Sequence, residues 1–159
     1  MNITHEMLLS ILNKLTSGVI VADSDGNFVL WNDMANSLIK VPIRVTPVEE
    51  WTGFYGVFKM DSETRYTNEE LPLLRACAGD TVVKECLFVR NEMKPLGIYL
   101  SVNAYPVVED GDTVGGIAIF DDISKEVETK VLLREFAATV EHMKAVLESS
   151  IDQFQNNKN

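Results

Sequence analysis

Residues 123–159 contain neither glycine nor proline. Such a stretch lacks the residues that most often end a helix, and its apolar residues recur at alternating steps of three and four positions. This heptad pattern extends over about three repeats and predicts one long helix with a single apolar seam. Because such a helix has no core of its own, we expect its seam to pack against a second copy of the chain in a parallel homodimer. The seam consists of Leu133, Phe136, Val140, Met143 and Leu147, followed by Ser150 and Phe154.

A shorter helix is predicted at the other end of the chain, over residues 4–15. Thr4 is a suitable N-cap, and the apolar residues that follow fall at helical spacing. They are Met7, Leu8, Ile11, Leu12 and Leu15. We expect this amphipathic helix, residues 1–16, to pack beside the C-terminal helix or across the dimer.

The middle of the chain, residues 17–122, has the pattern of antiparallel strands with a few short helices. Residues 18–31 form the clearest hairpin, because Asp25-Gly26 permits the positive φ of a tight turn. A short helix is expected after Asn32 or Asp33, and another from Asn68 to a stop at Gly79. Three further strands are expected at 81–90, 98–106 and 113–120, and in the second of these alternation places Ile98, Leu100, Val102 and Ala104 on one face. The pattern predicts an α+β fold with a five-stranded antiparallel sheet and helices on one face.

Charge and hydropathy exclude some classes of function. The chain has 14 basic and 24 acidic residues and a formal net charge of −10. With no basic cluster, we expect no nucleic-acid partner. No run approaches the roughly 20 apolar residues of a membrane span, and the N-terminus lacks the pattern of a secretory signal. We therefore expect no membrane association and a cytoplasmic location.

Several motifs, taken in order, resemble a PAS domain, the small sensor module of bacterial signalling proteins. The hairpin at 18–27 resembles the opening of that domain, and Trp31-Asn32 stands where the family commonly has an Asn entering its first short helix. Residues 71–79 are similar to the "lPL.rAl.G" helix of one PAS subgroup. The last hairpin and the end of the core are represented by Tyr105-Pro106, Asp110-Gly111, Gly115-Gly116 and the triplet Asp122-Ile123-Ser124.

The resemblance covers roughly residues 8–124 and implies a PAS core followed by a C-terminal signalling helix. The triplet Asp122, Ile123 and Ser124 then forms the signal junction between the two. The implied function is that of a sensory module that dimerises and relays the binding of a ligand or partner to its C-terminal helix. A kinase or another output domain is the expected signalling partner. The alternative is a structural dimerisation and protein-interaction module that binds no small molecule.

The known cofactors of PAS domains make demands that this sequence does not meet. A flavin photoreceptor needs a reactive Cys in an Asn-Cys-Arg-Phe-type motif, which is absent. Histidine-ligated haem needs a core His, whereas His5 and His142 both lie outside the predicted core. The cofactor is therefore unknown, and it is either absent or a small apolar ligand, because no Arg or Lys cluster offers to bind a phosphate or a dicarboxylate.

Apolar residues of the core are candidates for a ligand pocket above the sheet, although they equally suit ordinary core packing. Cys77 is interpreted as a buried structural thiol rather than a haem ligand. The candidates are Trp51, Phe54, Tyr55, Leu74, Cys77, Leu100, Ile117 and Ile119. No nucleophile and base stand in a pattern typical of catalysis, and no cluster suggests a metal site, so we expect no enzymatic activity.

Residues 134–143 resemble the phospho-acceptor helix of histidine kinases, with Phe136, Val140 and His142 at matching offsets. The match fails after the His, where Met143 replaces the usual acid. His142 is therefore a minor candidate for a phospho-acceptor that works with a kinase in trans.

Overall fold

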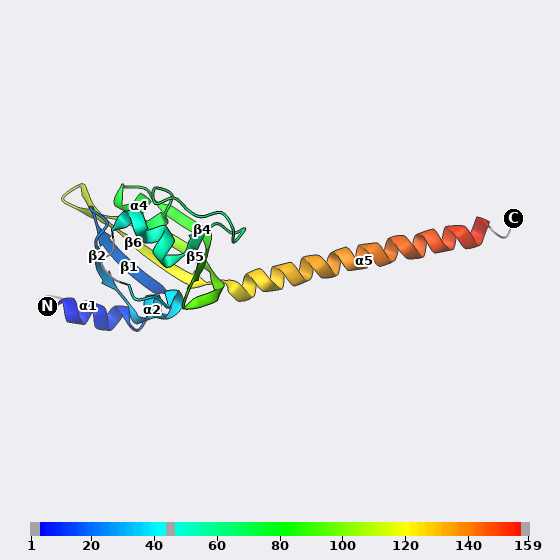
Figure 1. Ribbon diagram of the computed structural model, residues 1–159, viewed down its shortest axis with the longest axis horizontal. Coiled ribbons are helices and arrows are strands. Elements are labelled where there is room, and N and C mark those ends of the chain that lie inside the picture. The colour runs from blue at the N-terminus through cyan, green and yellow to red at the C-terminus, as the bar shows by residue number, and fades with distance from the viewer. Residues whose placement is uncertain (1–3, 44–46, 157–159) are drawn as a thin grey trace. The chain divides into compact units, whose positions relative to one another are not determined.

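The computed structural model describes residues 4–43 and 47–156. The chain divides into two compact units, one that ends at Ile123 and one that begins at Ser124 (Figure 1). The helices are α1 (His5–Leu12), α2 (Asp33–Ile39), η1 (Val48–Glu50), α3 (Trp51–Tyr55), α4 (Pro72–Cys77) and α5 (Ser124–Asn156). The strands are β1 (Gly18–Asp23), β2 (Phe28–Trp31), β3 (Val57–Phe58), β4 (Val82–Asn91), β5 (Lys94–Glu109) and β6 (Asp112–Asp122).

All strands belong to one antiparallel sheet with the order β2-β1-β6-β5-β4-β3. The α+β fold and the antiparallel sheet confirm the prediction, but the sheet has six strands rather than five. The additional strand is β3, which lies outside the strands predicted from the sequence. Two residues are too few to display an alternating pattern, and β3 exists because Val57 and Phe58 pair with Val89 and Phe88 of β4.

The turn between β1 and β2 is held by the Asp23 carboxylate. Its Oδ1 accepts hydrogen bonds from the backbone N–H groups of Asp25 (3.0 Å) and Asn27 (2.8 Å), and Gly26 has φ +84°. Hydrogen bonds from the Asn27 side chain and backbone lower the pKa of Asp23 because they favour the charged form. The predicted hairpin is thus present, with the expected glycine in its turn.

Helix α4 begins later than predicted. The sequence favoured a start at Asn68, whereas the structure starts the helix at Pro72. Leu71 has an extended conformation (φ −61°, ψ 128°) because proline disfavours the helical region for the residue before it. Asn68 instead accepts a turn hydrogen bond from the Leu71 N–H at 3.1 Å.

Strand β4 has no continuous inward face because its register shifts between Val82 and Glu85. Lys84 at this bulge has φ +52°, which rotates the residues that follow it. Beyond the bulge, Leu87 and Val89 belong to the core. In β5 the predicted alternation is confirmed, since all four inward residues named above are at most 5% exposed.

The core lies between the sheet and helices α2, α3 and α4. Figure 1 shows α4 in front of β5 and β6, and each of the three helices contributes buried residues to the same cluster. Representative members are Ala35 and Ile39 of α2, Trp51 of α3, and Leu73 and Ala76 of α4. One face of the sheet therefore carries the core.

Helix α1 has the predicted N-cap, because the Thr4 hydroxyl accepts a hydrogen bond from the Met7 N–H at 3.2 Å. The helix ends at Leu12 rather than Leu15, with Asn13 as its C-cap. Within residues 4–43 and 47–156, no helix combines the length and apolar character needed to cross a membrane.

Candidate ligand cavity and signal junction

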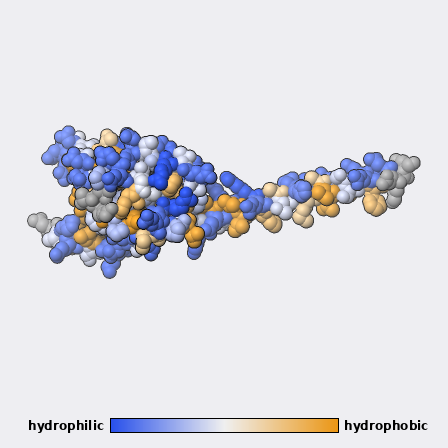
Figure 2. Space-filling model, viewed as in Figure 1, coloured by the Kyte–Doolittle hydropathy of each residue, from blue (hydrophilic) through white to orange (hydrophobic). Residues whose placement is uncertain are grey.

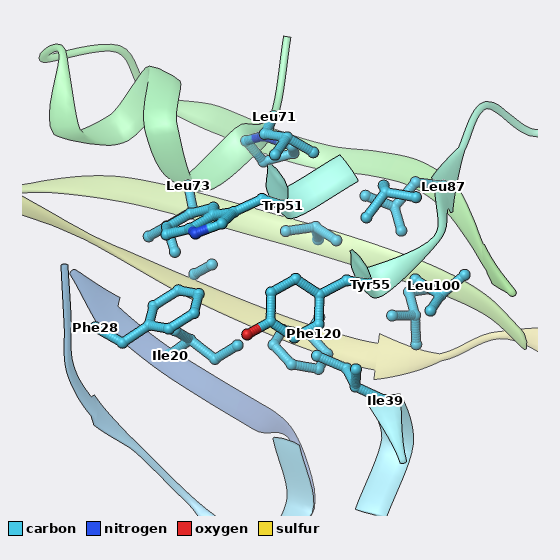
Figure 3. Close-up of a pocket in the computed structure, with 15 residues that line it drawn as sticks. Ile20, Phe28, Ile39, Trp51, Tyr55, Leu71, Leu73, Leu87, Leu100 and Phe120 are labelled. Carbon is cyan, nitrogen blue, oxygen red and sulfur yellow. The ribbon is translucent and has the colours of Figure 1, made fainter. Parts of the chain in front are cut away.

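A cavity of about 110 Å³ lies between the sheet and the helices. Figure 3 shows its side chains converging from both layers. All of the lining residues that the structure describes are apolar or aromatic, and none of these is charged. They are Ile20, Phe28, Ile39, Trp51, Tyr55, Val57, Leu71, Pro72, Leu73, Leu87, Val89, Leu100, Val102, Ala118 and Phe120.

Aromatic rings form one wall of the cavity. Phe28 stacks on Trp51 with ring centroids 4.3 Å apart, and its edge meets Tyr55 at 6.1 Å. Trp51 and Tyr55 are 3% and 7% exposed. Burial of these large rings contributes strongly to the stability of the core.

Three of the predicted pocket residues line the cavity, namely Trp51, Tyr55 and Leu100. Three others, Phe54, Leu74 and Cys77, are partly buried and pack against the core without lining it. Burial and the charge of Asp23 raise the pKa of the Cys77 thiol. Cys77 is therefore a neutral thiol at neutral pH, in agreement with a structural role.

The last two predicted pocket residues, Ile117 and Ile119, are half-buried and do not line the cavity. Their neighbours Ala118 and Phe120 line it instead, since these pair with Ala104 and Val102 of β5. Both faces of this strand are apolar, so alternation by itself did not identify the inward face. The sequence signal for the inward face was Gly116, since a glycine inside a strand often marks the close approach of another segment. In the structure, a Cβ at Gly116 would come within 3.0 Å of Ala76 in α4.

The predicted signal junction follows directly from cavity-lining strands. Asp122 at the end of β6 pairs in register with Leu100 of β5, which lines the cavity. The Ile123 N–H donates to the Tyr99 carbonyl at 2.9 Å, and Ser124 is the first residue of α5. Asp122 and Ile123 are thus attached to β5, one of the strands that line the cavity.

Comparisons with known proteins reveal similarity in structure alone. No family model and no curated protein matches the chain. The chain is similar to an RNA-binding light-oxygen-voltage receptor (19% identity, TM-score 0.57), over 86% of this chain and 38% of that one. It is also similar to the PAS domain of a Colwellia psychrerythraea protein (15% identity, TM-score 0.52), over 76% of this chain and 97% of that one. A third similar structure is the PAS domain of nitrogen regulation protein NR(II) from Vibrio parahaemolyticus, with 13% sequence identity and a TM-score of 0.50. This match covers 74% of this chain and 98% of that one.

The chain has a PAS fold. This confirms the fold expected from the ordered motifs. At these identities the similarity concerns the arrangement of the backbone, and ligand and output have to be inferred from the residues of this chain.

Sequence reasoning missed most residues that line the cavity of the PAS core. Ile20 and Val102 were within reach of strand alternation, because they occupy inward positions of β1 and β5. Phe28, Ile39 and Leu73 come from segments far apart in the sequence and meet only in the folded core. No local pattern marks such residues as neighbours.

The seam of α5 is exposed along its whole length in the single chain. Figure 2 shows apolar residues distributed along this helix, and the five predicted seam residues from Leu133 to Leu147 are 45% to 69% exposed. His142 lies on the same helix and is also exposed. Among the described residues, no group of His, Cys, Asp and Glu is arranged to hold a metal ion.

Proposed function

We propose that this chain is a non-enzymatic sensory PAS module that binds a small apolar molecule in its core cavity. It relays occupancy of the cavity through the signal junction to α5, as a homodimer joined by its terminal helices. The observation that carries the proposal is the position of Leu100, which lines the cavity and pairs with Asp122 at the junction. A change at the cavity thus has a short covalent and hydrogen-bonded path to the signalling helix.

The cavity defines the class of ligand. Its volume of about 110 Å³ is below the roughly 150 Å³ of an engineered cavity that holds benzene. The cavity therefore suits an apolar molecule of at most about the size of benzene, whereas flavin and haem are much larger. Within residues 4–43 and 47–156, no charged group lines the cavity, which disfavours phosphates and carboxylates as ligands.

The lining is equally unsuited to catalysis. Among the lining residues that the structure describes, the only hydroxyl is that of Tyr55, and none carries a carboxylate, an imidazole, an amine or a thiol. General acid–base or covalent catalysis requires a pair of such groups within hydrogen-bonding distance. Binding is therefore the function that this cavity supports.

Dimerisation is supported by the exposed apolar faces of the terminal helices. In α1, Met7, Leu8 and Ile11 are 38% to 49% exposed, and the α5 seam is exposed to a similar or greater extent. A heptad seam of this kind is buried when a second copy packs against it. A kinase or another output domain is the partner that we propose for the signalling helix.

Native mass spectrometry of the purified chain, together with an absorbance spectrum, tests the proposal. We expect a dimer that carries a small additional mass per chain, which is lost on denaturation. A dimer of bare chains that also fails to bind added benzene would contradict ligand sensing and favour the ligand-free dimerisation module. A monomer would contradict the role of the terminal helices.

A further inference from the structure

The hairpin between β4 and β5 supplies hydrogen-bond donors to the ends of two helices. Asn91 Nδ2 donates to the Ile39 carbonyl at 2.9 Å and to the Tyr55 carbonyl at 3.3 Å. Ile39 is the last residue of α2 and Tyr55 is the last residue of α3. Carbonyls at helix C-termini have no partner within the helix, so one amide group satisfies an acceptor of each helix.

A second side chain of the hairpin binds to the C-terminal end of α2. Lys94 Nζ donates to the Leu38 carbonyl at 3.0 Å, and this contact is partly buried. Asn91 is itself oriented by the hairpin, since its Oδ1 accepts a hydrogen bond from the Met93 N–H at 3.1 Å. The hairpin therefore holds α2 and α3 through three hydrogen bonds from two side chains.

Two of the three residues held in this way line the cavity. Ile39 and Tyr55 both direct their side chains into it (Figure 3). A ligand larger than the cavity has to displace these side chains, and their backbone can move only if the Asn91 hydrogen bonds lengthen or break. Each such bond, once broken, leaves a poorly hydrated carbonyl unpaired, which opposes the movement.

We propose that Asn91, together with Lys94, sets the upper size limit of the ligand by fastening the α2–α3 wall of the cavity to the β4–β5 hairpin. Asn91 is thus a positioning residue that determines specificity without touching the ligand. The inference rests on the proposed function, because it concerns the same cavity.

The first test measures the fastening in the full chain without ligand, by hydrogen–deuterium exchange. In Asn91→Ala and Asn91→Asp, amides of residues 33–43 and 51–57 should exchange at least about tenfold faster than in the parent chain, and in Lys94→Met the amides of residues 33–43 should do so. Asn91→Asp removes the donor while it keeps an acceptor for Met93. Met93→Ala, at an exposed position of the same hairpin, is the matched control and should leave exchange unchanged. Unchanged exchange in all three variants would overturn the inference.

The second test measures the size limit with benzene and naphthalene as probes, by NMR titration. The parent chain should bind benzene and exclude naphthalene, and Asn91→Ala should shift the ratio of the two dissociation constants toward naphthalene by about tenfold. If benzene binds and the ratio stays the same, the size limit is overturned and the proposed function stands. If neither hydrocarbon binds to the parent or the variants, the ligand-sensing function fails, and the exchange data still decide whether Asn91 fastens the wall.

Discussion

At the scale of single residues, Asn32 connects several parts of the PAS core. Its side chain is 1% exposed and is the only buried amide or charged side chain among the described residues. Oδ1 accepts hydrogen bonds from the N–H groups of Val19 and Ala35, and Nδ2 donates to the carbonyls of Leu12 and Ser17. One amide therefore caps α2, holds β1 and attaches the end of α1. The cap was among the predictions, but the attachment of α1 was not, because it depends on a residue 20 positions away.

We expect Asn32→Ala to lower the free energy of unfolding by about 2–4 kcal/mol, because it leaves buried donors and acceptors unpaired. Urea titration followed by circular dichroism measures the change. Asn36→Ala, at an exposed position of the same helix, is the control and should change stability by less than about 0.5 kcal/mol. Equal effects of the two substitutions would mean that the Asn32 network adds little to stability.

At the scale of elements, the sequence predicts both the helix α5 and a partner for it, whereas the structure of a single chain describes the helix alone. The helix is confirmed over Ser124–Asn156, and none of its residues is buried. Ser150 interrupts the seam and turns its hydroxyl to the Val146 carbonyl at 2.9 Å. The heptad pattern predicts a partner helix, and the register and orientation of the proposed helix pair would depend on that second copy.

If the chain forms the proposed dimer, we expect the double substitution Phe136→Glu and Val140→Glu to convert it to a monomer, because it places two charges in an apolar seam. Sedimentation-equilibrium centrifugation gives the mass. Val131→Glu places a charge on the same helix but away from the seam, and this control should remain dimeric. A dimer that persists in the double variant would place the interface on other elements.

At the scale of the whole molecule, the cavity distinguishes two alanines that face each other across β5 and β6. Ala104 and Ala118 are paired in register, and both are buried. Ala118 lines the cavity, whereas Ala104 does not. The same added volume should therefore have opposite consequences at the two positions.

We expect Ala118→Leu to abolish binding of benzene while it keeps or raises the thermal midpoint, because the added methyl groups fill empty space. In contrast, Ala104→Leu should lose about 1–3 kcal/mol, since it overpacks a filled region. Calorimetry and NMR titration measure the two effects. If Ala118→Leu destabilises the fold as much as Ala104→Leu does, the space beside Ala118 is too small to hold a ligand.

The amino-acid sequence by itself determined the features that depend on neighbours along the chain. These include the Asp23–Asn27 turn, a helix start at Asn32 or Asp33, the inward face of β5 and the apolar stripe of α5, because each arises from local backbone preference or a short repeat. The tertiary structure decided which distant segments meet. It placed Ala118 and Phe120, rather than Ile117 and Ile119, over the cavity, and it brought Asn91 to the ends of α2 and α3. A cavity is space left between packed side chains from several segments, so its size and lining emerge only when all of them are in place.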